Sequence, residues 1–219
     1  SVVGCDIATD GSVLVSGYVN ANSSTMNLRN AGAVVAAVPI PDVDPPVLTT
    51  PRHGYTFKVA ADGLSVDWVQ LVTSAAVTNL AGPVSMTTIV REDQDAVFVA
   101  GCASSAVNFY AGAGNAWNGY AVGGATTRTF PNGGALGSTL AGWFVAKYNL
   151  TTGALVRVFS GYGSTGTISG SPLGSETIVG IADMLTDVYD GLVLYMINTD
   201  NAQIELDPEG PSPSNLPAS

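Results

Sequence analysis

Short runs of β-branched and aromatic residues alternate along this chain with clusters of Gly, Asn, Asp and Pro. In all-β domains, each such run is a strand and each cluster is a turn. Even the longest candidate for a helix, residues 64–80, favours a strand, because it is rich in β-branched and aromatic residues: Val66, Trp68, Val69, Leu71, Val72 and Thr73. The pattern therefore predicts an all-β fold of antiparallel strands with almost no helix.

Dipeptides of Asp and Gly mark three expected turns, at Asp10-Gly11, Asp62-Gly63 and Asp190-Gly191. Glycine in such a pair supplies the positive φ angle that a tight connection between antiparallel strands needs. All three lie inside segments that recur along the chain, so we expect the turns to recur along the fold.

Two segments of the chain recur. The first, residues 6–19, has an acidic turn followed by an alternating strand, and it returns at 90–103 and 185–198. The second, residues 57–68, returns at 146–158 with one extra residue before its glycine. The order is therefore first, second, first, second, first, which is typical of an internal repeat.

The repeats predict a single all-β domain over residues 1–206 with about two and a half units, at 1–85, 86–176 and 177–206. Long insertions rich in Ala, Gly, Asn and Thr occupy residues 20–52 and 104–142. Residues 207–219 are rich in proline, and we expect an extended tail or linker there.

Residues 7–19 (IATDGSVLVSGYV) and 143–163 (WFVAKYNLTTGALVRVFSGYG) resemble the repeat of the SBBP-type β-propeller family. The closest matches are Asp10, Gly11, Gly17, Lys147, Asn149 and Gly153, with a looser set at Lys58, Asp62, Gly63 and Trp68. The resemblance implies propeller-like antiparallel blades in a mostly non-catalytic extracellular domain. Because propellers need about four blades to close, it implies an incomplete ring. A β-sandwich built from the same hairpins is the alternative.

Charge is scarce in this chain. Its 219 residues include 7 Lys or Arg and 17 Asp or Glu, which gives 11% charged residues and a net charge of −10, against about a quarter charged in ordinary soluble proteins. The lack of a basic cluster argues against nucleic acid as a partner and against an electrostatic anchor on anionic lipid. No run approaches the ~18 apolar residues of a spanning helix, so we expect no membrane insertion.

Several features favour a secreted or cell-surface protein. Sequons for N-glycosylation occur at Asn22 and Asn149. Cys5 and Cys102 can form one disulfide at most, and the other interpretation is two buried thiols. The sequence opens with Ser1, as expected for a mature product or an excised piece.

Residues for catalysis are few. His53 is the only histidine and lies in a turn-like context, where we expect an exposed loop residue. The chain has no Gly-x-Ser-x-Gly motif, and its one His and two separated Cys cannot build the usual zinc site. Asp93 and Asp95 have a spacing that Ca²⁺ can use, although acids before each repeated strand are better explained as turn formers. We therefore predict no catalytic residue and no cofactor other than this possible calcium.

Aromatic residues in the second insertion are the candidates for contact with a ligand or a partner, because exposed rings can stack on sugars or anchor a protein. They are Trp117, Tyr120, Phe109 and Tyr110. Trp68 and Trp143 lie within strand patterns instead and are expected in the core.

These observations favour a secreted, non-catalytic structural subunit of a cell-surface fibre, sheath or extracellular matrix. Its expected partners are further copies or other extracellular structural proteins, because broad uncharged surfaces pack with little desolvation of ions. The alternative is a carbohydrate-binding or adhesion module with glycans as partners. A glycoside hydrolase, which needs two carboxylates about 5–10 Å apart, is a more distant alternative.

Overall fold

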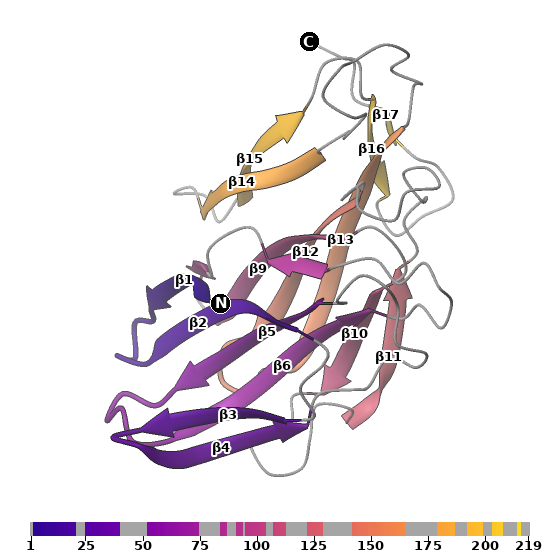
Figure 1. The fold of residues 1–219 in the computed structure, drawn as a ribbon. Coiled ribbons are helices and arrows are strands. Elements are labelled where there is room, and N and C mark those ends of the chain that lie inside the picture. The colour runs from indigo at the N-terminus through magenta and orange to yellow at the C-terminus, as the bar shows by residue number, and fades with distance from the viewer. Residues whose placement is uncertain are drawn as a thin grey trace, which may run out of the picture.

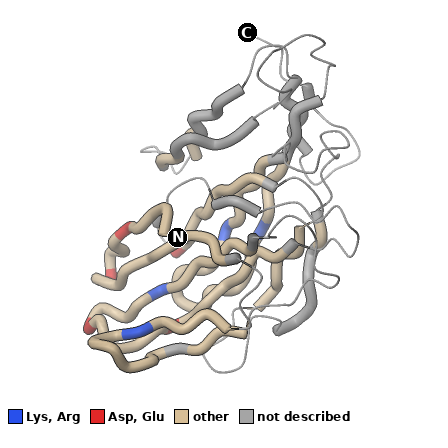
Figure 2. The backbone as a smooth tube through the Cα atoms, viewed as in Figure 1, with Lys and Arg blue, Asp and Glu red and all other residues tan. Residues whose placement is uncertain are grey.

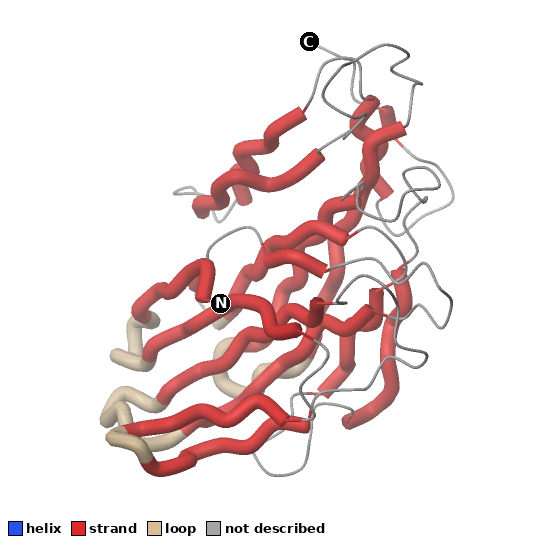
Figure 3. Tube along the Cα trace, viewed as in Figure 1, coloured by secondary structure: helices blue, strands red, loops and turns tan. Residues whose placement is uncertain are grey.

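The computed structural model describes residues 2–20, 25–39, 52–74, 84–86, 91–93, 95–103, 107–112, 122–128, 142–164, 179–186, 192–198, 203–207 and 214–215. Every element among them is a β-strand, and every strand pairing is antiparallel (Figure 3). The prediction of an all-β antiparallel fold is confirmed, including the strand that replaces the possible helix at 64–80. Across these residues, no helix has the length and apolar character needed to cross a membrane.

Sheet 1 has six strands in the order β1-β2-β5-β6-β10-β11 (Figure 1). The strands are β1 (Val2–Ile7), β2 (Val13–Asn20), β5 (Arg52–Val59), β6 (Val66–Ser74), β10 (Val107–Gly112) and β11 (Val122–Arg128). The first four stand in chain order, whereas β10 and β11 come from the second insertion and extend the sheet beyond β6.

Sheet 2 has seven strands in the order β17-β16-β13-β12-β9-β7, with β8 also paired to β9. They are β7 (Val84–Met86), β8 (Arg91–Asp93), β9 (Ala96–Ala103), β12 (Gly142–Asn149), β13 (Leu155–Ser164), β16 (Gln203–Asp207) and β17 (Ser214–Asn215). Because β17 pairs with β16, part of the proline-rich segment 207–219 belongs to a sheet, and the prediction of a tail or linker is wrong there.

Two hairpins form separate two-stranded sheets: β3 (Thr25–Asn30) with β4 (Ala33–Pro39), and β14 (Val179–Thr186) with β15 (Leu192–Asn198). Figure 1 shows the β3–β4 hairpin at one end of the molecule and the β14–β15 hairpin toward the other.

The central strand pairs of the two sheets, β2–β5 and β9–β12, have corresponding registers. Val13 pairs with Val59 in sheet 1, and Val97 pairs with Tyr148 in sheet 2. A register shift follows Lys58 in the β5–β6 pair, and another follows Lys147 in the β12–β13 pair. The two sheets thus share strand order, register and the position of an irregularity.

Three clusters of buried residues separate the layers. The first lies between the two sheets, with residues from both: Ala8, Leu14, Trp68, Val72, Val97, Val99, Val107, Phe109, Phe144, Ala146, Tyr148, Leu150 and Val158. The second covers the other face of sheet 2 and includes Trp143 and Met184 of β14. The third covers the other face of sheet 1, where Met26 and Leu28 of β3 pack against it. Trp68 and Trp143 are both buried, as predicted.

Turn glycines are where the sequence placed them, since φ is +82° at Gly11 and +70° at Gly63; the turn at 190–191 lies outside the described residues. The expectation for His53 is wrong, because it is 0% exposed. His53 lies on β5, where it pairs with Val19 of β2. Since β5 has β2 on one side and β6 on the other, His53 belongs to a central strand of sheet 1 and not to a loop.

Candidate interaction surfaces

Exposed large apolar residues concentrate on two elements of the described chain. Val2, Val3 and Ile7 lie on β1, and Leu185 and Val193 lie on the β14–β15 hairpin. Single exposed apolar residues are normal on protein surfaces, whereas groups of them mark contact surfaces. These two groups are therefore the candidate interaction surfaces.

The β14–β15 hairpin has one covered and one open face. Met184 is fully buried and Leu192 packs with it against sheet 2. Leu185 and Val193 are paired directly across the two strands, and they are 48% and 46% exposed. Since successive residues of a strand point to opposite faces, this apolar pair points away from sheet 2.

The same position of the repeated segment is covered in the other two copies. Leu14, Phe98 and Val193 each stand ninth in segments 6–19, 90–103 and 185–198. Leu14 is 0% exposed and Phe98 is 5% exposed. Leu14 packs against sheet 2, and Phe98 packs in the cluster that includes β14. Among the described residues, only the third copy lacks a layer over this face.

Strand β1 is the first strand of sheet 1, with β2 as its neighbour. Cys5 pairs with Val15, which packs in the cluster under the β3–β4 hairpin. Cys5 and Ile7 share that face of the sheet, and both are exposed; a register shift between Val2 and Gly4 interrupts the alternation at Val3. Cys5 and Ile7 form a small exposed patch on the face of sheet 1 that the β3–β4 hairpin covers over other strands.

The corresponding edge of sheet 2 is different. There, two short strands, β7 and β8, take the place of one continuous strand, and β8 carries Arg91, Glu92 and Asp93. Short strands and charges are the usual protection of a sheet edge against pairing with another chain. The six-residue strand β1 carries only Asp6 as a charge.

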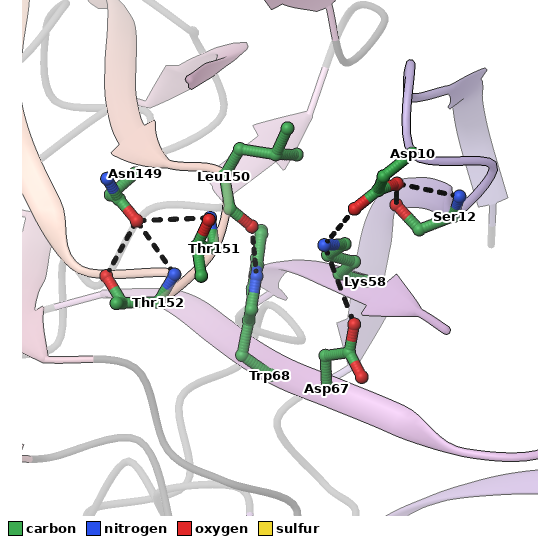
Figure 4. A network of polar contacts seen from close by, with 9 residues as sticks. All are labelled: Asp10, Ser12, Lys58, Asp67, Trp68, Asn149, Leu150, Thr151 and Thr152. Carbon is green, nitrogen blue, oxygen red and sulfur yellow. Dashed lines mark hydrogen bonds and ion pairs between the residues drawn. The ribbon is translucent and has the colours of Figure 1, made fainter. Parts of the chain in front are cut away.

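Lys58 forms the main ionic cluster of the described chain (Figure 4). Its Nζ lies 2.7 Å from Oδ2 of Asp10 and 3.6 Å from Oδ2 of Asp67. Lys58 is buried, whereas the Asp10 and Asp67 side chains are 48% and 38% exposed. One lysine thus joins the β1–β2 turn to strands β5 and β6. Sequence reasoning missed this cluster; the available signal was a lysine in the strand pattern between two acidic turns.

The carboxyl of Asp10 is held in its ionised form. The hydrogen bond from Lys58 is the largest cause, followed by the bonds that Ser12 donates from its hydroxyl and its backbone N–H, and together they hold the pKa of Asp10 well below its usual range. Figure 2 shows the acidic positions gathered around the turns at one end of sheet 1. Such an ion pair is suited to holding a turn.

Asn149 caps the turn between β12 and β13. Its Oδ1 accepts hydrogen bonds from Thr151 N–H (3.1 Å), Thr152 N–H (2.8 Å) and the Thr152 hydroxyl (2.9 Å) (Figure 4). Its Nδ2, the atom to which an N-glycan attaches, makes no hydrogen bond within the described residues and points away from the turn. The cap is therefore compatible with a glycan on Asn149. Asn22 lies outside the described residues.

The predicted aromatic surface is not formed by the residues that can be placed. Phe109 is buried and packs edge-on against Phe144, with ring centroids 5.0 Å apart. Tyr110 is also buried, and its hydroxyl is 2.8 Å from the Thr73 hydroxyl. The prediction for these two is wrong, because β10 pairs with β6 inside sheet 1 instead of lying in an open loop. Trp117 and Tyr120 lie outside the described residues.

The cysteines are not joined. Cys102 is buried on β9 in sheet 2, and Cys5 is exposed on β1 in sheet 1, so the disulfide that the sequence allowed is absent from the structure. For the calcium prediction, the Asp93 side chain lies outside the described part, and Asp95 is exposed with its backbone carbonyl accepting from Leu150 N–H. Within the described residues, no group of three or more His, Cys, Asp or Glu is placed to hold a metal ion.

Comparison of the chain with protein-family models, curated proteins and solved structures found no match.

Proposed function

We propose that this chain is a non-catalytic structural subunit of an extracellular assembly, such as a cell-surface fibre, sheath or matrix, and that it binds further copies of itself. The observation that carries the proposal is the open apolar face of the β14–β15 hairpin. Leu185 and Val193 are about half exposed, so covering them would contribute roughly half the value for full burial, about 0.7–1.5 kcal/mol for each side chain, which favours a partner on this face.

The finer architecture belongs to the same proposal. Strands β1-β2-β5-β6 would be one blade, β7/β8-β9-β12-β13 the next, and β14–β15 the first half of a third, with each stacked on the face of its neighbour. The corresponding registers of the central strand pairs, β2–β5 and β9–β12, support this arrangement. Strands β10 and β16 support it further. Strand β10 follows β9 of the second unit and pairs with β6, the outer strand of the first unit. Strand β16 follows β15 of the third unit and pairs with β13, the outer strand of the second unit.

An extracellular setting is part of the proposal and has its own support. The Asn149 amide nitrogen is available in an exposed turn with Thr151 in the sequon position. Low charge also suits a packed assembly, because few ions must lose water when copies meet. The net charge of −10 opposes association at low ionic strength, so salt should promote it.

Light scattering coupled to size exclusion, across protein concentration and salt, tests the proposal. We expect the mass to rise with both, and Val193→Asp to reduce the rise. Val156→Asp is the matched control, since Val156 is an exposed valine on β13, away from the hairpin. A wild-type chain that stays monomeric at every concentration and salt would refute the proposal. Electron microscopy of the native material then distinguishes filaments from sheets.

A further inference from the structure

We propose that the free edge of strand β15 binds a second-segment hairpin, the kind that β5–β6 and β12–β13 form, and that a partner chain supplies it. The inference rests on the correspondence of units in the proposed function and goes beyond self-association. Both second-segment hairpins of this sequence are already paired within sheets 1 and 2, so neither is free to fill the edge of another copy. The partner is therefore a different chain that presents an unpaired hairpin of this chemistry.

The corresponding edge is occupied in both other units. Strand β2 lies between β1 and β5, and β9 lies between β12 and the two short strands β7 and β8. Among the described strands, β15 pairs with β14 alone. The two strands that follow β15 do not fill the position, since β16 pairs with β13 and β17 pairs with β16. The open position beside β15 is thus the one that β5 and β12 occupy in the other units.

Backbone groups of β15 face this edge at every second residue. In sheet 2, the carbonyl oxygen of Asp95 accepts a hydrogen bond from Leu150 N–H. Because hydrogen-bonded pairs alternate along an antiparallel ladder, the backbone groups of Val97 also face β12. Leu192 stands eighth in the third copy of the first segment, as Val97 does in the second copy. Its N–H and C=O groups are therefore available to an added strand, which binds through such main-chain groups.

The lysine of the second segment suits the exposed side chain on β15. In both occupied edges, a lysine stands opposite the ninth residue of the first segment. Lys58 pairs with Leu14. Lys147 pairs with Phe98, and its Nζ lies 5.1 Å from the centroid of the Phe98 ring. Val193 is the ninth residue of the third copy and is 46% exposed, so the aliphatic part of a lysine opposite it would cover it.

A second, independent observation lies on the outer strands. In sheet 1, Trp68 and Gln70 of β6 are buried and donate to carbonyl oxygens of the β12–β13 turn. The strand registers place Arg157 and Phe159 of β13 at the corresponding positions in sheet 2. Arg157 is exposed and lies 4.8 Å over the ring of Phe159, which is only partly buried. The turn of a third hairpin would cover this pair, with the Arg157 guanidinium donating in place of the Trp68 indole.

Fluorescence anisotropy with a labelled synthetic hairpin, residues 52–74 of this chain, tests the interface. The full chain is used below the concentration at which it self-associates. We expect saturable binding that Arg157→Ala weakens about ten-fold. Arg29→Ala is the matched control and should leave binding unchanged, because Arg29 is an exposed arginine on β3. Circular dichroism confirms that both variants are folded.

Backbone N-methylation of the hairpin separates strand pairing from simple adhesion. In sheet 1, Ala60 N–H donates to Ser65 of the same hairpin, so the N–H of Phe57, an odd number of residues away, faces β2 instead. N-methylation at Phe57 should therefore weaken binding to β15 about ten-fold. N-methylation at Leu71 should leave binding unchanged, because Leu71 pairs with Tyr55 and its N–H faces the far edge of the hairpin. Neither change alters a side chain or a bond within the hairpin.

A pair of cysteines checks the register. The chain carries Val193→Cys and Cys5→Ser, and the hairpin carries Lys58→Cys as a mixed disulfide with thionitrobenzoate. Directly opposed residues of an antiparallel pair lie within the range that a disulfide spans. Thiol–disulfide exchange then joins the two sulfurs and releases thionitrobenzoate, so no oxidant is required. We expect release about ten-fold slower from a hairpin with Phe57→Cys, which points to the opposite face.

Each part of the inference can fail separately from the proposed function. No binding of the hairpin, or equal binding of both N-methylated hairpins, would refute strand pairing at β15. Equal release from the two cysteine hairpins would refute the register. Hairpin binding that disappears as the chain self-associates would assign the edge to a second copy and overturn the choice of partner. The proposed function fails on a different result, a chain that stays monomeric by light scattering.

Discussion

The indole nitrogen of Trp68 donates a 2.9 Å hydrogen bond to the carbonyl oxygen of Leu150, across the interface between the two sheets. Nearby, Gln70 Nε2 donates to the carbonyl oxygen of Gly153, also at 2.9 Å. Both bonds run from strand β6 to the turn between β12 and β13 (Figure 4 shows the first). The packing of one sheet on the other thus has directional polar contacts as well as an apolar core.

Trp68→Phe should destabilise the chain more than Trp143→Phe. Both tryptophans are buried, but Trp143 Nε1 has no hydrogen-bond partner among the described residues. Removing the Trp68 donor deprives a buried carbonyl of its partner, which costs about 1–3 kcal/mol, whereas removing the Trp143 donor relieves an unsatisfied group. Urea unfolding of the two variants measures the difference. Equal losses in the two would contradict the role given to the Trp68 bond.

The sequence predicted most of the strands because their pattern is local. The sequence repeat aligns Trp68 with Val158. In the structure Trp68 corresponds to Arg157, because Trp68 pairs with Lys58 and Arg157 pairs with Lys147. The reason lies in the turn. Gly63 N–H donates to the carbonyl oxygen three residues before it, whereas Gly153 N–H donates to the one four residues before it. The two turns, residues 60–65 and 149–154, nevertheless have the same length. A shifted turn glycine looks like an insertion in sequence and is not one in the sheet.

Acid should remove the contribution of Asp10 to stability. The pKa of Asp10 is lowered in the folded chain by Lys58 and Ser12, and the ordinary value is near 4. Its contribution is therefore fully present above about pH 4 and is lost as the pH falls toward the folded-state pKa. Because Asp10 is half exposed, we expect only about 0.2–1 kcal/mol.

Thermal unfolding from pH 6 to pH 2 tests this expectation in Asp10→Asn and the wild type. The two stabilities should converge as the pH falls below 4. Asp62→Asn is the control, because Asp62 accepts a hydrogen bond from Leu64 N–H in the same kind of turn and pairs with no lysine in the described chain. A constant gap between Asp10→Asn and the wild type down to pH 2 would contradict the ion-pair explanation.

Tyr148→Phe should be neutral or stabilising by up to about 2 kcal/mol, because a buried hydroxyl with no partner is a cost to folding. Tyr148 is fully buried between the sheets, its hydroxyl has no hydrogen-bond partner among the described residues, and burial raises its pKa. Tyr110→Phe is the matched comparison, since that hydroxyl contacts Thr73 at 2.8 Å. It should cost about 0.5–1.5 kcal/mol. Urea midpoints that fall equally in the two variants would indicate an unseen partner for Tyr148.

The candidate surfaces were harder to predict than the strands. Phe109 and Tyr110 stand in a segment rich in small residues, where the sequence predicted exposure, but β10 crosses to the edge of β6 from a distant part of the chain. A strand that pairs with a partner far away along the chain leaves no local signal. Similarly, the exposure of Ile7 follows from its place on an outer strand, which the sequence pattern of β1 alone does not disclose.

Asn149 should carry a glycan without losing its cap. In a host that glycosylates secreted proteins, Thr151→Ala should remove the glycan at Asn149, which intact mass measures. Thr151 contributes only its backbone N–H to the cap, so this variant should keep the stability of unglycosylated wild type. Asn149→Asp retains an acceptor oxygen, whereas Asn149→Ala removes the acceptor of three hydrogen bonds and should cost about 1 kcal/mol. A Thr151→Ala protein as unstable as Asn149→Ala would show that the turn depends on more than the Asn149 oxygen, and an unchanged mass would show that Asn149 is not the acceptor.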